Sequence, residues 1–280
     1  KMEKINFTKM VGAGNDFIVL DRRSSLVIRG SLSKIAQLLC DRKTGIGADG
    51  VLVLEKSKIA DFKMGVFNAD GSVAEMCGNG LRCAILFSGI RRKVKVETKA
   101  GIYESEITGK DKIRIKMGEP KGLRLNFPIN VNGRTLNVNF INTGVPHTVV
   151  FVEGLDEIDT AGIGSTIRYH DEFKPKGTNV NFAEIIDGGN IKIRTYERGV
   201  EGETLACGTG SAASAIISTL KAQPQTTHFV RVRGMGSRLK VDVHTRGGIL
   251  KVEFDKIGNK IKNVYLEGEA KAVFQGGVYV

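Results

Sequence analysis

The chain is poor in cysteine, histidine and proline, and these scarcities argue against several classes of protein. Its 280 residues include four cysteines, four histidines and five prolines, and the cysteines form no CxxC pair. Zinc sites usually draw on closely spaced Cys and His pairs, so the sequence predicts no metal site. A thiol redox protein would need a CxxC pair or a resolving cysteine at short spacing, so that alternative has little support.

Long apolar runs are missing as well. No run of about 18 apolar residues occurs, and no signal peptide opens the chain, so we expect no membrane span. Cysteines without an evident disulfide framework fit a reducing compartment, and we therefore expect a cytoplasmic protein.

Positive charge is plentiful, with a formal net charge of +12. Nucleic-acid binders cluster such charge on a patch or a recognisable motif, whereas Lys and Arg are scattered here and no RNA-binding aromatic motif occurs. We therefore expect a basic surface and no nucleic-acid partner, with at most a role in attracting an acidic substrate. Hydrophobic residues at 41% and charged residues at 26% are ordinary for globular proteins.

Two similar motifs, 130 residues apart, organise the sequence. The first covers residues 67–83 and contains the box Cys-Gly-Asn-Gly from Cys77; the second covers residues 197–210 and contains Cys-Gly-Thr-Gly from Cys207. A polar residue stands nine positions before each cysteine, Asn68 in the first motif and Arg198 in the second. Each box precedes a run that is apolar nearly all round, which is typical of a buried helix. The chain is interpreted as two copies of one module.

Turn signals and alternating apolar residues predict mostly strands around these helices. Glycines at residues 12 and 14 do not form a dinucleotide-binding loop, because a β-branched strand rather than a helix follows them. The Pro- and Gly-containing stretch 118–122 predicts a boundary between residues 1–120 and residues 121–269, with residues 270–280 returning to the first domain. Strands are predicted at residues 5–10, 17–20, 51–54, 62–67, 94–98, 101–107, 112–117, 136–141, 148–152, 180–185, 191–196, 228–232, 239–244, 249–254 and 264–267.

One further helix is predicted to begin with Ser33 as its N-cap and to end at Cys40. Cys40 is interpreted as a core residue of that helix. Cys83 lies six residues into the first buried helix and is likewise interpreted as packing. The buried side of the helix from Ser33 is predicted to consist of Ile35, Ala36, Leu38 and Leu39.

The position of Cys77 and Cys207 suggests acid–base chemistry. The first turn of a helix has free N–H groups and a partial positive charge, so a thiol there ionises more readily than free cysteine. The glycines of each box let backbone amides approach a carboxylate. Inverting a carbon next to a carboxylate needs a base on one face and an acid on the other, and two thiols in an interdomain cleft meet that need without a metal or pyridoxal cofactor. A disulfide between them would block this role.

The chain resembles the diaminopimelate epimerase family, and the resemblance extends from near the first strand to beyond residue 210. The segments that carry it are Gly14-Asn15-Asp16-Phe17, Gly45-Ile46-Gly47-Ala48-Asp49, residues 67–72, Asn179-Val180-Asn181-Phe182, Glu197-Arg198-Gly199 and the two cysteine boxes.

The resemblance implies an isomerase that needs no cofactor and interconverts LL- and meso-diaminopimelate in lysine and peptidoglycan precursor biosynthesis. It implies an α+β fold of two pseudo-symmetric domains, each a curled, barrel-like mixed β-sheet around a central buried helix, with the active site in the interdomain cleft. The partner is a small-molecule substrate, and a homodimer is compatible with the sequence.

The resemblance also assigns roles to residues. Cys77 becomes the proton donor and Cys207 the acceptor in the LL-to-meso direction. Arg198 would clamp the distal carboxylate, Glu197 would tune the site near an ammonium group, and His147 is a candidate for tuning the thiols. The remaining substrate contacts would come from Asn15, Asn68, Gly78, Asn79, Asn179, Gly208 and Thr209.

For some of these residues a purely structural role stays open as an alternative. Asn68 could be only a turn residue, Arg198 only a surface charge, and His147 only a histidine packed against a turn. Two positions also depart from the family pattern. Val145 stands where an Asn often precedes Pro-His, and Gly50 stands where a Gln often follows the Asp that is Asp49 here. At most backbone contacts are expected from these two positions.

Neighbouring enzyme classes remain alternatives. Proline and hydroxyproline racemases share the two-cysteine logic but favour a His where this chain has Asn79, and they need no clamp for a second carboxylate. An isomerase of the same fold with a carboxylate base is a more distant alternative, since both positions here are Cys.

Overall fold

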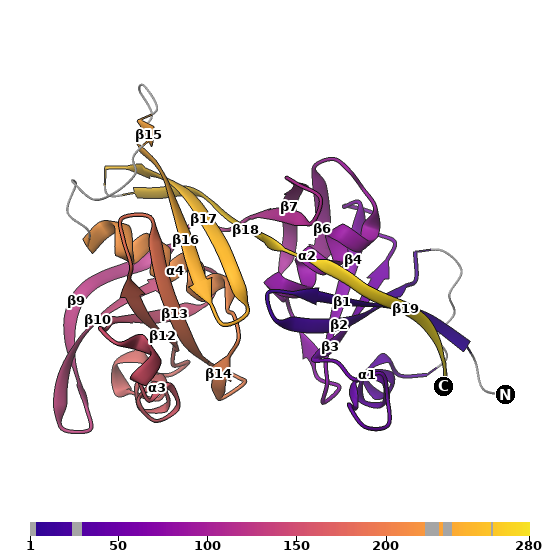
Figure 1. Ribbon diagram of the computed structural model, residues 1–280, viewed down its shortest axis with the longest axis horizontal. Coiled ribbons are helices and arrows are strands. Elements are labelled where there is room, and N and C mark those ends of the chain that lie inside the picture. The colour runs from indigo at the N-terminus through magenta and orange to yellow at the C-terminus, as the bar shows by residue number, and fades with distance from the viewer. Residues whose placement is uncertain (1–3, 24–29, 222–229, 232–236, 259) are drawn as a thin grey trace. The chain divides into compact units, whose positions relative to one another are not determined.

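The chain forms two compact units, and the computed structural model describes residues 4–23, 30–221, 230–231, 237–258 and 260–280 (Figure 1). Unit 1 contains the chain up to Ile115 and from Gly268 onward, and unit 2 runs from Lys116 to Glu267. The sequence placed the boundary at 120/121. That each unit is a separately folding domain stays a prediction.

Unit 1 is a mixed sheet around one buried helix. Its strands pair in the order β19, β1, β2, β3, β4, β6, β7, β8, with β5 against β4; β2–β3 and β4–β6 are parallel and the other pairs are antiparallel. The elements are β1 (Lys4–Gly12), β2 (Asn15–Asp21), α1 (Leu32–Cys40), β3 (Gly50–Glu55), β4 (Phe62–Asn68), β5 (Val73–Ala74), α2 (Gly78–Ser88), β6 (Val94–Thr98), β7 (Gly101–Ile107), β8 (Lys112–Lys116) and β19 (Lys271–Tyr279).

Unit 2 repeats this topology. Its strands pair in the order β9, β10, β11, β12, β13, β16, β17, β18, with β14 against β13 and β15 against β16; β11–β12 and β13–β16 are parallel. The elements are β9 (Lys121–Val131), β10 (Arg134–Asn142), β11 (Pro146–Phe151), η1 (Leu155–Glu157), α3 (Thr160–Arg168), η2 (Asp171–Phe173), β12 (Asn179–Ile185), β13 (Asn190–Glu197), β14 (Gly202–Thr204), α4 (Gly208–Lys221), β15 (Val230–Arg231), β16 (Ser237–Thr245), β17 (Gly248–Ile257) and β18 (Lys260–Glu269).

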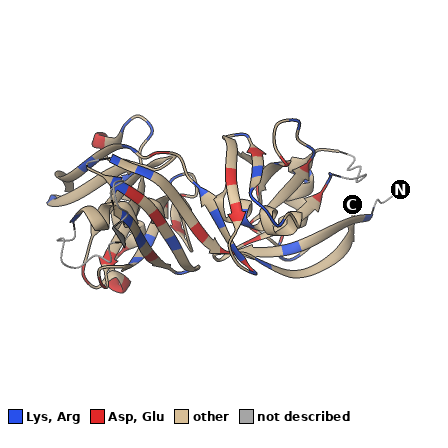
Figure 2. Ribbon diagram, turned by 90° about the horizontal axis from the view of Figure 1, so that it is seen from above, with Lys and Arg blue, Asp and Glu red and all other residues tan. Residues whose placement is uncertain are grey.

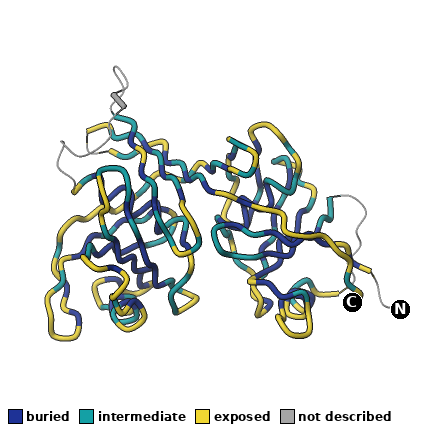
Figure 3. The backbone as a smooth tube through the Cα atoms, in the orientation of Figure 1, coloured by how far each residue is buried: buried dark blue, intermediate teal, exposed yellow. Residues whose placement is uncertain are grey.

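Each sheet curls around its helix, as predicted. Helix α2 contacts β1, β2, β3, β4, β7 and β19, and α4 contacts β10, β11, β12, β13, β16 and β17. Residues 79–85 of α2 and 210–219 of α4 are all buried, so exposure is confined to the helix ends (Figure 3). A helix without a polar face has to be enclosed, and strands with alternating burial, such as β16 and β17, turn their apolar side toward it.

Helix α2 ends for a local reason. Gly89 adopts a left-handed conformation with φ 74° at the C-cap, which glycine reaches without a Cβ clash. Its N–H faces the carbonyl oxygen of Leu86 at 3.4 Å. The next strand of the unit, β6, follows five residues later.

Two details of α1 differ from the sequence prediction. The N-cap is Ser31 rather than Ser33, and its side chain makes no capping hydrogen bond. Leu38 is 63% exposed, whereas Leu39 is 2% exposed. At 100° per residue the buried stripe is Ile35, Ala36, Leu39 and Cys40, and Leu38 falls outside it.

The sequence also missed strand β9. This strand carries Pro128 and is exposed along most of its length, so it lacks the alternation that predicts strands. Of the strand predicted at residues 228–232, only 230 and 231 lie within the described residues, where they form β15. Asp70 and Gly71 form the hairpin turn between β4 and β5, with the Asn68 N–H donating to the Ser72 carbonyl at 2.9 Å.

The contrast between the two leucines of α1 gives a stability test. Leu39→Ala should lower the free energy of unfolding by about 2–5 kcal/mol, because it leaves a cavity in the core. Leu38→Ala, on the same helix, should change it by less than about 0.5 kcal/mol. Urea unfolding followed by circular dichroism measures both, and equal losses would contradict the assigned helix face.

Candidate active site

Cys77 caps the N-terminus of α2. Its backbone is extended, with φ −139° and ψ 118°, and its sulfur accepts the Gly80 N–H at 3.5 Å. The Leu81 N–H donates to the Cys77 carbonyl at 2.8 Å, which begins the helix. The thiol therefore lies where unpaired amides and the helix dipole favour negative charge.

Asn79 is fixed by two hydrogen bonds inside unit 1. Its Nδ2 donates to Oδ1 of Asn15 at 2.5 Å, and its Oδ1 accepts from Nη2 of Arg82 at 2.6 Å. Arg82 is fully buried, and burial lowers the pKa of its guanidinium. The structure thus joins two predicted site residues, Asn15 and Asn79, directly, and an arginine that was not predicted holds Asn79 from its other side. The only sequence signal for Arg82 was its place as a charge inside an apolar run.

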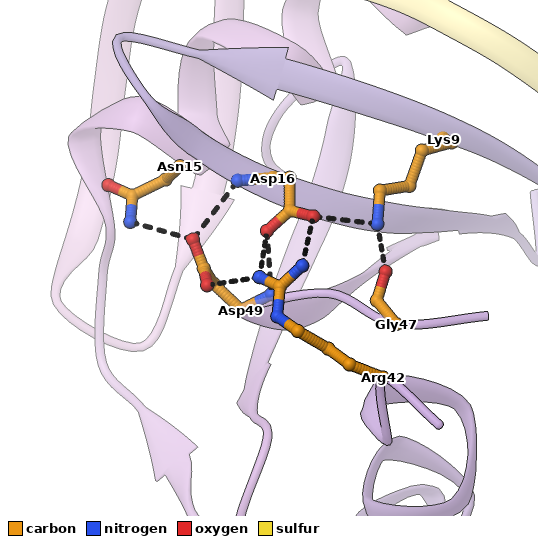
Figure 4. A network of polar contacts seen from close by, with 6 residues as sticks. All are labelled: Lys9, Asn15, Asp16, Arg42, Gly47 and Asp49. Atoms are coloured by element: carbon orange, nitrogen blue, oxygen red, sulfur yellow. Dashed lines mark hydrogen bonds and ion pairs between the residues drawn. The ribbon is translucent and has the colours of Figure 1, made fainter. Parts of the chain in front are cut away.

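A charged network continues from Asn15, at the start of β2, to the segment before β3 (Figure 4). Asn15 donates to Oδ2 of Asp49 at 3.1 Å, and Arg42 bonds Asp49 and Asp16, each at 2.8 Å. Lys9 pairs with Asp16 at 2.7 Å and donates to the carbonyl of Gly47. Burial opposes ionisation of Asp16, but Arg42 and Lys9 outweigh it and lower its pKa to about 2.

Cys207 occupies the matching place in unit 2. It is buried, and its carbonyl accepts the first helical N–H, from Ser211, at 2.8 Å. Its sulfur lies 3.5 Å from Oγ1 of Thr209, and Nε2 of His147 lies 2.8 Å from the same hydroxyl. Burial, together with the charge of Arg198, lowers the pKa of His147 to about 3, so this imidazole is neutral at physiological pH.

The segment around Arg198 is organised by Asn179. The Asn179 amide accepts the Arg198 backbone N–H at 2.9 Å and donates to the Pro146 carbonyl at 2.9 Å. The Arg198 guanidinium reaches the carbonyl of Lys176 at 3.2 Å. Burial raises the pKa of Glu197, partly offset by its hydrogen bond with Thr204.

The other positions singled out from the sequence are Asn68, Gly50 and Val145, and each has an ordinary structural environment. Asn68 is exposed at the end of β4 and donates to Oγ of Ser72 at 2.8 Å, as a turn residue would. A Cβ at Gly50 would approach the Phe67 carbonyl to 2.7 Å, so a longer residue there requires a shift of the sheet. The carbonyl of Val145 accepts the Thr143 N–H at 3.3 Å.

Glycine is present for different reasons at different positions of the two cysteine boxes. Gly78 faces no heavy atom that a Cβ would meet, which suits an open approach. A Cβ at Gly80 would approach Leu52 to 2.9 Å, and one at Gly210 would collide with Asn181 and crowd His147. The fourth residue of each box is therefore glycine for packing inside its unit, whereas the sequence interpretation had assigned it to ligand approach.

Cys40 and Cys83 are core residues, as predicted. Both are at most 3% exposed. Burial raises the pKa of the Cys40 thiol to about 11 and that of Cys83 to about 12. Such thiols stay protonated at neutral pH, which leaves Cys77 and Cys207 as the candidates for acid–base chemistry.

Features of a metal site and of a membrane span are missing from the residues that the structure describes. That part of the chain contains no group of three or more His, Cys, Asp or Glu that could hold a metal ion. None of its helices is long and apolar enough to cross a membrane. Lys and Arg alternate with Asp and Glu over the strands of both units (Figure 2), and many form ion pairs, such as Arg194 with Glu203 at 2.7 Å.

Two solved structures have the same fold as this chain. A PhzF-family phenazine biosynthesis protein from Bacillus anthracis is 17% identical, with a TM-score of 0.73 and 100% of each chain covered. A probable proline racemase from Agrobacterium radiobacter K84 is 16% identical, with a TM-score of 0.65, covering 98% of this chain and 92% of that one. At these identities the likeness concerns the fold alone.

Sequence comparison goes further. The family model for diaminopimelate epimerase matches residues 7–123 and 139–273. Diaminopimelate epimerases from Aquifex aeolicus and Methanocella arvoryzae are each 42% identical; the first match covers 97% of both sequences, and the second covers 100% of this chain and 98% of the relative. The chain belongs to the diaminopimelate epimerase family and is an enzyme of the isomerase class.

The network around Asp16 predicts a pH effect on stability. Because the folded pKa of Asp16 is about 2 against 3.8 for the free side chain, its ionised form stabilises the fold above pH 4, and this contribution is lost as pH falls toward 2. Solvent screening limits it to on the order of 1 kcal/mol. Asp16→Asn should therefore be less stable than the parent at pH 7, with the difference shrinking below pH 4.

Urea unfolding at several pH values measures this effect. Asp111→Asn, outside the network, serves as the control. A stability difference for Asp16→Asn that stays constant from pH 7 to pH 3 would contradict the role given to Arg42 and Lys9.

Proposed function

We propose that this enzyme epimerises LL-diaminopimelate to the meso form with two cysteines and no cofactor. One observation carries the proposal: Cys77 and Cys207 occupy the same place at the start of the buried helix in two units of the same topology. The proposal requires the two half-sites to meet around one substrate molecule.

The proton path follows from the chemistry of the α-carbon. In the LL-to-meso direction the Cys207 thiolate removes the α-proton, and the electron pair left behind spreads onto the adjacent carboxylate. The Cys77 thiol then delivers its proton to the opposite face. Cys207 ends as the thiol and Cys77 as the thiolate, so the reverse reaction uses the same groups with exchanged roles.

The reacting carboxylate would bind at the two helix N-termini. Backbone amides around Gly78 and Asn79 in unit 1, and around Gly208 and Thr209 in unit 2, supply N–H groups at positions where anions bind. These amides stabilise the negative charge that develops as the proton leaves. Asn15, held by Asn79, would line the same end of unit 1.

The second carboxylate distinguishes this substrate from an ordinary amino acid. We assign its recognition to Arg198, since a guanidinium can bind a carboxylate through two parallel hydrogen bonds. Asn179 supports this role by holding the Arg198 backbone, and Asn68 would add a contact from unit 1. The half-buried Glu197 would lie near an ammonium group, and His147 would tune Cys207.

Meso-diaminopimelate suits lysine and peptidoglycan precursor biosynthesis, and on the basis of that pathway we place the enzyme in the cytoplasm. Proline racemisation is the alternative that the fold likeness raises. The same assays, run with proline, distinguish the two.

The mechanism predicts hydrogen exchange at carbon. Incubated with LL-diaminopimelate in deuterated water and a reductant, the enzyme should incorporate deuterium at one α-carbon without added pyridoxal phosphate. Cys77→Ala and Cys207→Ala should each lower epimerisation by about a hundredfold or more, the range for loss of a general acid or base. Proton NMR follows both reactions.

Cys83→Ala is the matched control, since this cysteine lies on the same helix as Cys77 but is buried. It should keep its turnover per folded molecule. No deuterium incorporation by the reduced parent enzyme would overturn the proposed reaction, and full turnover of either cysteine variant would remove that residue from it.

Arg198 provides a test of substrate class. Arg198→Ala should raise KM for diaminopimelate by about tenfold to a hundredfold, because a charged hydrogen-bonding partner is lost. Its Tm should change little, since among the described residues the Arg198 guanidinium donates to a single group, the Lys176 carbonyl. Arg246→Ala, which removes an arginine that pairs with Glu203 at 3.2 Å, should leave KM unchanged. A large fall in Tm with unchanged KM would assign Arg198 a structural role.

A further inference from the structure

Asn181 lies at the centre of a buried polar cluster in unit 2. It is fully buried on β12, and its side chain makes three hydrogen bonds. Its Nδ2 lies 3.2 Å from the Thr148 carbonyl and 3.1 Å from Nδ1 of His147, and its Oδ1 lies 3.0 Å from Oγ1 of Thr195. The mechanism above does not use this residue.

The neighbours of Asn181 determine how its amide is oriented. The Thr148 carbonyl can only accept a hydrogen bond, so the amide nitrogen has to face it. The Thr195 hydroxyl then donates to the amide oxygen. The reverse orientation would place two acceptor oxygens together in a buried site, at the cost of an unsatisfied polar group.

This orientation fixes the tautomer of His147. The amide nitrogen has two protons; one goes to Thr148, and the other points to Nδ1 of His147. That nitrogen must therefore accept. Because His147 is neutral, its single ring proton lies on Nε2, which donates to the Thr209 hydroxyl 2.8 Å away.

The tautomer of His147 in turn determines the direction of the Thr209 hydroxyl proton. It accepts from His147 and has one proton of its own to donate, and the Cys207 sulfur lies 3.5 Å away. A donor that points at the sulfur favours the thiolate over the thiol. We propose that Asn181 is a positioning residue: by holding His147 as the Nε2–H tautomer, it makes Thr209 donate to Cys207 and stabilises the thiolate of that cysteine.

The surrounding residues are consistent with such a relay. Gly210 has to lack a Cβ because one would collide with the Asn181 oxygen. Arg198, which directly follows β13, is the charged group that acts on His147. The hydrogen-bond partner of the Thr209 hydroxyl is still His147.

Unit 1 has a different arrangement around its cysteine. At the offset of 130 residues, Phe17 stands for His147 and Asn79 for Thr209. The strand pairings place Leu52 where unit 2 has Asn181, since Leu52 pairs with Val19 and Asn181 with Val149. Asn79 is held by Arg82 instead. The relay therefore acts on Cys207 alone, and Cys77 serves as an internal reference in the same molecule.

Asn181→Asp tests the relay with little change of shape. A carboxyl oxygen carries at most one proton where the amide nitrogen carries two, and the Thr148 carbonyl takes that one. Nδ1 of His147 then loses its donor, the ring proton moves to Nδ1, and Nε2 accepts from Thr209. The hydroxyl proton is turned away from Cys207.

Two readouts on the ligand-free, reduced enzyme decide the inference. The ¹⁵N shifts of the His147 ring should report Nε2–H in the parent and Nδ1–H in Asn181→Asp. The midpoint pH for alkylation of Cys207 by iodoacetamide, read by peptide mass spectrometry, should rise by about one unit in the variant, while that of Cys77 stays unchanged.

Thr209→Val tests the last link should Asn181→Asp fail to fold. It keeps the side-chain shape and removes the hydroxyl, so it should raise the Cys207 midpoint by a similar amount, and Thr209→Ser should restore it. An Nδ1–H tautomer in the parent, or a Cys207 midpoint unmoved in Thr209→Val, would overturn the inference.

Only the expected effect of the relay on catalysis rests on the proposed function; its effect on the Cys207 thiol does not. If Cys207 is the base, the acidic limb of the pH profile of kcat/KM should shift together with the midpoint pH for alkylation of Cys207. A shifted midpoint with an unshifted limb would support the relay and count against Cys207 as the base, so the two failures are distinguishable.

Discussion

Each unit depends on one constraint, the complete enclosure of a helix. Residues 79–85 of α2 and 210–219 of α4 have no exposed face, so most of the curled sheet packs against them. Only the helix ends remain open, and the N-terminal end is where backbone amides and the dipole favour negative charge. Enclosure therefore leaves one place for ionisable chemistry, and each unit has a cysteine there.

The two units share one topology but surround their cysteines with different chemical groups. In unit 1 the support is charged: the buried Arg82 holds Asn79, and the network around Asp16 holds Asn15. In unit 2 it is neutral, passing through the Thr209 hydroxyl and the uncharged imidazole of His147. The repeated topology thus carries two unequal thiol environments, one supported by charged groups and one by neutral groups.

The sequence predicted most of the strands and both central helices, because their patterns are strong and local. Its error at Leu38 arose because neighbouring leucines in a short helix cannot all face one way. It missed β9 because an exposed edge strand with a proline has no alternation. It named Cys77, Asn79 and Thr209 but missed Arg82, whose bond to Asn79 lies within one helical turn of an otherwise apolar run. It also missed Asn181, which matters through buried contacts with residues 14 to 34 positions away, and no local pattern encodes such contacts.

The pairing of β1 with β19 links the first strand of unit 1 to the last strand of the chain. All of unit 2 lies between them in sequence, so its sheet is inserted into the chain of its neighbour. During synthesis the ribosome releases the residues of unit 2 before those of β19. The unit that begins first is therefore the one completed last, and until then β1 presents an unpaired edge.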